Sequence, residues 1–144
     1  MKSTLLRRRK PRTHLLVFAI DDDVKTTLLR FARDENILSA HFHALGALQR
    51  VTVAYWNWGT KDYSRIEINE QVEVVSFVGN LSRDAEGRPK LHAHAALGKR
   101  DGTLVGGHFV DGSVRPTLEL VLEEGEEEVV RRKDDVTGLD LIDL

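Results

Sequence analysis

Apolar and polar residues alternate along several short stretches of the chain, a pattern typical of half-buried strands. In the clearest stretch, residues 50–58, Val51 and Val53 fall on one face, while Thr52 and Ala54 fall on the other. Comparable runs, bounded by Gly, Asp and Asn, predict further strands over 13–20, 37–45, 63–68, 72–81, 90–97, 103–110, 114–122 and 137–142. We expect one strand to end at Gly46 before the next begins, and we expect residues 111–113 to form a turn.

Helical spacing of apolar residues occurs after Asp21–Asp23, where Val24, Leu28 and Phe31 form a stripe. The aspartates offer N-cap oxygens, and Asn36 is a suitable left-handed C-terminal residue. The order is strand, helix, and then strands joined by short turns. It predicts an α+β fold with one main helix packed on a curled, mostly antiparallel sheet of about seven to eight strands. One helix cannot cover both faces of such a sheet, so we expect the uncovered face to meet a second copy of the chain.

Composition narrows the class of protein. A chain of 144 residues, 41% hydrophobic and 31% charged, is typical of one soluble domain. We therefore divide it into a basic N-terminal arm, residues 1–12, and a single domain, residues 13–144. Its apolar runs fall well short of the ~20 residues that span a bilayer, so we expect no membrane segment. The lack of cysteine is consistent with a cytoplasmic location. The absence of cysteine excludes disulfides, thiolate nucleophiles and cysteine zinc sites.

The basic residues of the arm are candidates for nucleic-acid contact, because clustered cations hold phosphates. They are Arg7, Arg8, Arg9, Lys10 and Arg12. The alternative is a solvated chain end. The formal net charge of −2 argues against a strong electrostatic footprint for DNA over the whole domain.

The best candidate site is a trio of histidines. His92 and His94 lie at i and i+2 on a predicted strand, so both side chains point to the same face. Whether His108 joins them depends on the following turn. A two-residue turn at Asp101–Gly102 would send His108 to the opposite face, whereas a three-residue loop ending at Gly102 would set it opposite His94. The sequence permits the second register without requiring it.

Three neutral imidazoles with an open fourth position suit Zn²⁺, or less selectively Ni²⁺, Co²⁺ or Mn²⁺. Asp111 and Glu119 are the nearest candidates in sequence for carboxylates that support such ligands. The alternative is three ordinary histidines, hydrogen-bonded in a sheet or at an interface. Gly106–Gly107, just before His108, indicates a close approach of another backbone, a neighbouring chain or a ligand.

Other residues are weaker candidates for a functional site. His41 and His43 could join the cluster or lie at a subunit interface, and His14 is predicted to be structural. Tyr55, Trp56 and Trp58 could stack nucleobases, although such spacing is more typical of a core or an interface. An open three-histidine site could also serve a small metal-dependent enzyme, because bound metal can generate hydroxide near neutral pH. By spacing, however, no acid or base stands out to assist it.

Taken together, these segments resemble the plant and prokaryote conserved (PPC) domain, a domain of unknown function that plants attach to AT-hook segments. The matching pieces are residues 13–32, 44–55, 73–80, 91–94, 105–108, 131–133 and 138–139. The resemblance implies a homotrimer and a DNA-binding label, and it implies that His92, His94 and His108 form a metal site, with zinc as the expected metal. Plant hooks place arginines in the minor groove through Arg-Gly-Arg-Pro, a motif that Arg9–Arg12 lacks. We therefore predict a homotrimeric regulatory protein without catalytic activity.

Overall fold

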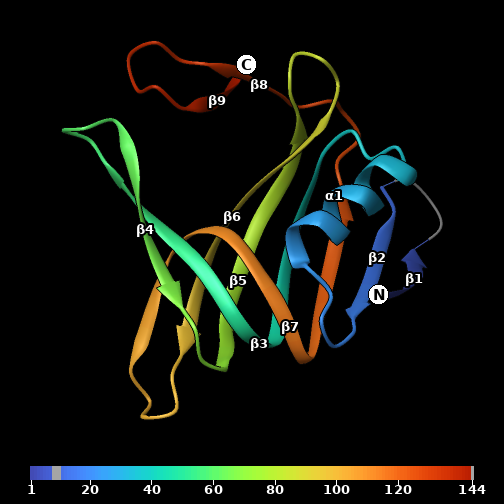
Figure 1. The fold of residues 1–144 in the computed structure, drawn as a ribbon. Coiled ribbons are helices and arrows are strands. Elements are labelled where there is room, and N and C mark those ends of the chain that lie inside the picture. Colours follow the sequence, from blue (N-terminus) through green and yellow to red (C-terminus); the bar gives the residue numbers. More distant parts are fainter. Residues whose placement is uncertain (8–10, 144) are drawn as a thin grey trace.

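The structure, a computed structural model, describes residues 1–7 and 11–143 (Figure 1). Within these residues, one helix, α1 (Val24–Asp34), accompanies a single sheet of nine strands, which confirms the predicted α+β class. The strands are β1 (Lys2–Arg7), β2 (Thr13–Phe18), β3 (Ala40–Asn57), β4 (Asp62–Ile68), β5 (Val72–Arg83), β6 (Pro89–Gly98), β7 (Leu104–Glu124), β8 (Val130–Lys133) and β9 (Asp140–Asp143).

The helix begins and ends where the sequence predicts. The Asp23 carboxylate accepts a hydrogen bond from the Thr26 backbone N–H at 2.8 Å, so it caps the first turn. Asn36, with φ of 52°, adopts the left-handed conformation just beyond the last turn. The buried stripe includes Leu28 and Phe31, and it packs the helix on the strands beside it (Figure 1).

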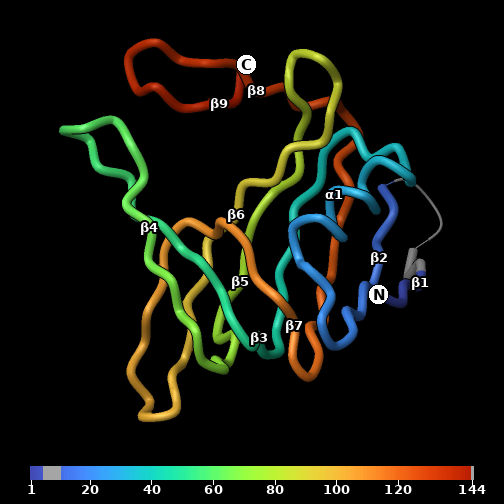
Figure 2. The backbone as a smooth tube through the Cα atoms, in the orientation of Figure 1, coloured from blue at the N-terminus to red at the C-terminus, as the bar shows by residue number. Residues whose placement is uncertain are grey.

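Four strands close into a ring, which explains the predicted curl. β3 pairs with β5, β5 with β6, β6 with β7, and β7 returns to β3, all antiparallel. The β1–β2 pair adds to β7, β4 adds to β3, and the β8–β9 hairpin joins β5 through a single parallel bridge. The smooth trace in Figure 2 shows these strands crossing one another at the centre of the molecule.

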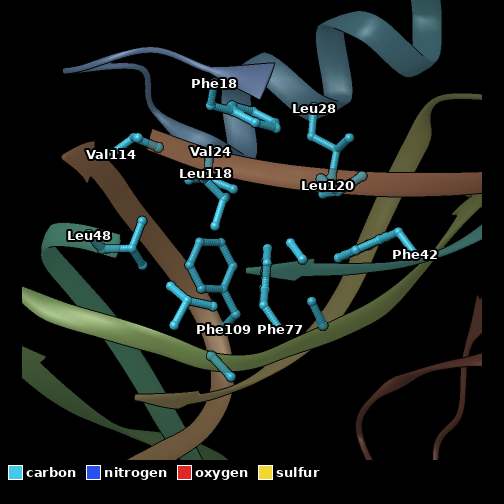
Figure 3. Packing of buried hydrophobic residues seen from close by; sticks show 14 of the residues in the cluster. Phe18, Val24, Leu28, Phe42, Leu48, Phe77, Phe109, Val114, Leu118 and Leu120 are labelled. Atoms are coloured by element: carbon cyan, nitrogen blue, oxygen red, sulfur yellow. The ribbon is translucent and has the colours of Figure 1, made fainter. Parts of the chain in front are cut away.

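The inside of this ring holds the hydrophobic core (Figure 3). Phe77 lies at its centre. The centroid of its ring is 5.3 Å from that of Phe42 and 4.7 Å from that of Phe109. Phe18 from β2 and Leu28 from α1 close the core from the helix side. Because side chains alternate along a strand, the residues between these positions face outward.

Two predicted breaks are wrong. β3 runs continuously through Gly46, and β7 runs through residues 111–113 without a turn. Register shifts at Ala44/Gly46 and Thr52/Val53 absorb the irregular residues as bulges, which bend a strand without ending it. Both strands can therefore pair with different strands at their two ends.

The predicted N-terminal arm also differs in part from the structure. Residues 2–7 form β1, an edge strand that pairs with β2 through Thr4 and Leu15 among others. Arg8, Arg9 and Lys10 lie outside the described residues. In the part of the chain that the structure covers, the helical segment is too short and too polar to cross a membrane.

Candidate metal centre

The loop between β6 and β7 decides whether the three histidines meet. The Lys99 backbone N–H donates to the Thr103 carbonyl at 2.9 Å, and the Gly102 N–H donates to the Lys99 carbonyl at 2.9 Å. Gly102 has φ of 84°, which favours glycine. This three-residue loop pairs His94 directly with His108, as the second of the two registers requires. The structure therefore brings all three histidines to the outer face of the ring.

The three imidazoles form a compact group. Each offers one ring nitrogen, and these nitrogens all lie within 4.8 Å of one another. His92 and His108 are partly buried, whereas His94 is exposed. The Nδ1 atom of His108 is buried and has no hydrogen-bond partner within the described residues. A buried polar atom without a partner is costly, and a metal ion in contact with this atom would remove that cost.

The surroundings keep two of the rings neutral. Burial lowers the pKa of His108 from 6.5 to about 4, with smaller contributions from the charges of His92, His94 and Lys25. Burial also lowers the pKa of His92, assisted by the positive charge of Arg131. Neutral imidazole has a free lone pair, which is the form that binds a divalent cation. The donor set and its protonation therefore both fit a transition metal.

The glycine pair before His108 has a structural explanation. A Cβ atom at Gly107 would lie 2.7 Å from the Ala54 carbonyl oxygen of β3, and a Cβ atom at Gly106 would collide with the Ala95 carbonyl of β6. β7 is thus held tightly between two backbones where the ring closes. This confirms the predicted close approach of another backbone and fixes the position of His108.

Arg131 on β8 is the main residue of the site that the sequence reasoning missed. Its side chain is only 8% exposed. Its Nε donates to Ser82 Oγ at 3.0 Å and its Nη1 to the Asp140 carbonyl at 2.9 Å. Its Nη2 donates to Asn80 Oδ1 at 3.0 Å and to Nδ1 of His92 at 3.3 Å.

The contact with His92 fixes the tautomer of that ring. A guanidinium can only donate, so His92 Nδ1 accepts and the proton of the neutral ring lies on Nε2. A metal at Nδ1 would occupy the lone pair that accepts from Arg131. A metal at Nε2 would move the ring proton to Nδ1, opposite an N–H of Arg131. Metal binding by His92 and the Arg131 hydrogen bond therefore exclude each other.

A cavity of about 450 Å³ adjoins His92 and His108. Two hairpins flank it, β3–β4 and β8–β9, which extend on the same side of the molecule (Figure 2). Their tips touch where Lys61 Nζ donates to the Val136 carbonyl at 2.7 Å. Trp56 and Tyr63 form an aromatic wall with ring centroids 4.8 Å apart, and Tyr63 stacks on His108 at 4.7 Å.

The two predicted supporting carboxylates make no hydrogen bond to these imidazoles among the described residues. Asp111 pairs with Thr52 across the β3–β7 ladder. Glu119 pairs with Leu45 and Val17, far along β7 from His108. The polar group that contacts the cluster is the cation of Arg131 instead.

The other histidines do not join the cluster. His43 lies in the same row of the outer face as His94, but Val78 of β5 stands between them. His41 is separated from His92 by Asn80 in the same way. His14 is buried, with Nε2 2.8 Å from Glu124 Oε1, as its predicted structural role requires.

The residues considered for nucleic-acid contact are placed differently. Arg12 forms ion pairs with Glu35 at 3.0 Å and Glu124 at 2.7 Å, so its charge is already neutralised within the fold. The exposed side chains of Tyr55 and Trp58 contrast with that of Trp56, which is half-buried beside Tyr63.

Comparison with known proteins identifies the family. The model of the Plants and Prokaryotes Conserved (PCC) domain matches residues 7–126. The chain belongs to the PCC domain family. This confirms the resemblance inferred from the sequence. None of the curated proteins compared with this PCC-domain chain matches it.

Solved structures of similar proteins share the PCC fold. A metal-containing protein from Archaeoglobus fulgidus is 30% identical, with a TM-score of 0.84 over 90% of this chain and 91% of that one. A plant- and prokaryote-conserved protein from Pyrococcus horikoshii is 29% identical, with a TM-score of 0.86 over 99% and 95%. A candidate DNA-binding protein from Bacteroides thetaiotaomicron is 23% identical, with a TM-score of 0.89 over 98% and 96%; at that identity it shows the fold alone.

Proposed function

We propose that this PCC-domain protein is a homotrimeric, cytoplasmic metal-binding protein in which His92, His94 and His108 bind zinc. Its role is regulatory or ligand-sensing rather than catalytic. The observation that carries the proposal is the set of three imidazole nitrogens, one from each ring, within 4.8 Å of one another. The buried Nδ1 of His108, which has no partner among the described residues, adds to it. The metal-containing relative from Archaeoglobus fulgidus, 30% identical, supports it.

The bound metal would supply positive charge and a coordination position open to a ligand. The residues of the chain position the imidazoles and keep two of them neutral. β6 and β7 hold the imidazoles in register, and burial keeps His108 neutral near physiological pH. Among the described residues, Asp111 and Glu119, the carboxylates expected to support the imidazoles, pair elsewhere in the sheet, and we therefore propose sensing as the role of the site.

Self-association is supported by the uncovered outer face. Leu45 is 61% exposed and Val78 is 49% exposed, and both lie on the face opposite the core. Large apolar side chains grouped on one face are typical of a surface that meets a partner. The PCC family resemblance names that partner as two further copies of this chain.

The metal proposal is tested by elemental analysis of the purified protein after chelation, incubation with Zn²⁺ and removal of unbound metal. We expect one zinc per chain in the wild type. His94→Ala should abolish retention because two remaining imidazoles bind zinc far more weakly. The matched control is His43→Ala, which removes an exposed histidine from the same row of the same face. Retention by His94→Ala, or loss in His43→Ala alone, would contradict the assignment.

DNA association is the second candidate. It is supported by the run Arg7–Lys10 and by the Bacteroides thetaiotaomicron protein of the same fold that is a candidate DNA-binding protein. Because Arg12 is paired with Glu35 and Glu124, we restrict the proposed phosphate contacts to Arg7, Arg8, Arg9 and Lys10. Such contacts predict binding that weakens steeply with salt.

Replacing Arg8, Arg9 and Lys10 with glutamine should weaken retention on duplex DNA and flatten its salt dependence. The control replaces three exposed cations of α1, Lys25, Arg30 and Arg33, in the same way. Equal retention of the wild type and the arm variant would remove this candidate and leave the metal proposal untouched.

A further inference from the structure

The cavity beside the histidines is positively charged. Its lining includes the cations Lys61, Lys90, Arg131 and Lys133, against the anions Asp62 and Asp140. Lys90 pairs with Asp140 at 3.2 Å. Lys61 and Lys133 donate instead to the uncharged carbonyls of Val136 and Gly138. Among the described residues, no carboxylate forms an ion pair with Lys61, Lys133 or Arg131.

Arg131 is the most unusual of these cations because it is 8% exposed and its contacts are with uncharged groups and His92. Burial lowers its pKa, and the negative charge of Asp140, which is shared with Lys90, opposes this only in part; the guanidinium stays protonated throughout the physiological range. Four of its five N–H groups have partners: Ser82, the Asp140 carbonyl, Asn80 and His92. A buried charge of this kind is normally matched by an opposite charge.

The remaining wall is mostly apolar and includes two aromatic rings. Trp56 and Tyr63 lie on the β3–β4 hairpin, while Leu91, Leu139 and Leu141 line the cavity from β6 and the β8–β9 hairpin. A volume of about 450 Å³ is that of a small-molecule site. The cavity therefore combines an apolar aromatic wall with unmatched positive charge, next to three metal-ligating side chains.

We propose that this cavity binds a small organic anion, a carboxylate or a phosphate ester with a flat apolar portion, whose anionic group contacts Arg131 beside the three-histidine centre. The proposal deepens the proposed function, since such a molecule is what a metal-bound sensor would detect. Metal binding by His92 would displace its hydrogen bond from Arg131 and so would free a second N–H for the anion. Metal and anion therefore bind cooperatively.

The test is calorimetric titration of benzoate and phenyl phosphate into the full-length protein, once metal-free and once loaded with zinc, with benzamide as the uncharged match of benzoate. We expect saturable binding of at least one anion, no comparable binding of benzamide, and tighter anion binding in the zinc-loaded protein. Preference for one anion identifies the carboxylate or the phosphate as the recognised group.

Arg131→Gln should weaken anion binding by about tenfold or more, the usual effect of losing a charge-assisted hydrogen bond. The control is Arg132→Gln on the same strand, which is 62% exposed and pairs with Asp143 rather than lining this cavity. Because Arg131 also ties β8 to β5, Lys61→Gln provides a second variant at the exposed hairpin tip. It should weaken binding by a smaller factor while circular dichroism stays unchanged.

Benzamide binding as tight as benzoate binding would overturn the proposal, as would equal effects of Arg131→Gln and Arg132→Gln. The absence of saturable binding of both anions in both states would also overturn it. Failure of the metal site is seen separately, as loss of zinc retention in elemental analysis. In that case the metal-free titration alone decides whether the cavity selects anions.

Discussion

The two faces of β6 have opposite roles. Ala93 and Ala95 point into the ring and are 2% and 6% exposed, while His92 and His94, their neighbours in sequence, lie on the outer face. The same contrast holds on β7, where Phe109 is in the core and His108 is in the cluster. Because successive side chains of a strand point to opposite faces, residues that stabilise the core and residues of the candidate site are neighbours in sequence. Substitutions at adjacent positions should therefore have different consequences.

The inner face should show the largest effect. Phe109→Ala removes a ring packed against Phe77 and leaves a cavity in the core. We expect it to lower the free energy of unfolding by about 3–5 kcal/mol. Urea unfolding measures this directly. The neighbouring variant His108→Asn should change stability far less at neutral pH, and a comparable loss in both variants would break the contrast between the faces.

The outer face should control assembly rather than folding. Val78→Asp places a charge among the exposed apolar residues between His43 and His94, so we expect the proposed trimer to dissociate while the circular dichroism spectrum is kept. Sedimentation equilibrium reports the mass. Val136→Asp, at the 69% exposed residue of the β8–β9 loop, is the control and should leave the trimer intact. A wild-type protein that sediments as a monomer would contradict this expectation.

The outer face also adds a pH dependence to stability, which is confined to acidic pH. His108 has a pKa of about 4 in the folded protein against 6.5 when unfolded, so between these values the unfolded chain binds a proton that the folded chain does not. Stability of the metal-free protein should therefore decrease as pH falls from 6.5 toward 4. The lowered pKa of His92 acts with the same sign.

His108→Asn should make this decrease shallower by up to the equivalent of one proton. The measurement is the urea midpoint of the wild type and the variant between pH 7 and pH 4. Parallel curves would show that His108 does not titrate as its burial requires.

Local patterns in the sequence were sufficient to predict the helix and the central hairpin. The Asp23 cap, the stripe on α1 and the loop ending at Gly102 all depend on residues close together in the chain. The structure adopts the one of the two allowed registers that sets His94 opposite His108, so the sequence supplied the candidate residues but not the choice of register. The break at Gly46 and the turn at residues 111–113 were predicted wrongly because turn-forming residues also occur in bulges of long, bent strands.

The rest of the site depends on contacts between distant segments. Arg131 reaches His92 because β8 meets β5 at a single parallel bridge, Arg83 with Val130, which leaves no periodic signal. The cavity forms where Lys61 and Val136, 75 positions apart, bring two hairpins together. In sequence, Arg131 stands in the basic run Arg131–Lys133, where a solvated charge is the ordinary expectation. Burial of its guanidinium is a property of the assembled fold.

The most direct test of the central claim is anomalous scattering from a crystal of the zinc-loaded protein, measured at the zinc absorption edge. The structure predicts one peak per chain, within coordination distance of His92, His94 and His108, with Arg131 no longer bonded to Nδ1 of His92. A zinc-loaded crystal with no peak at these three residues, or with its peak at His41 and His43, would contradict the assignment.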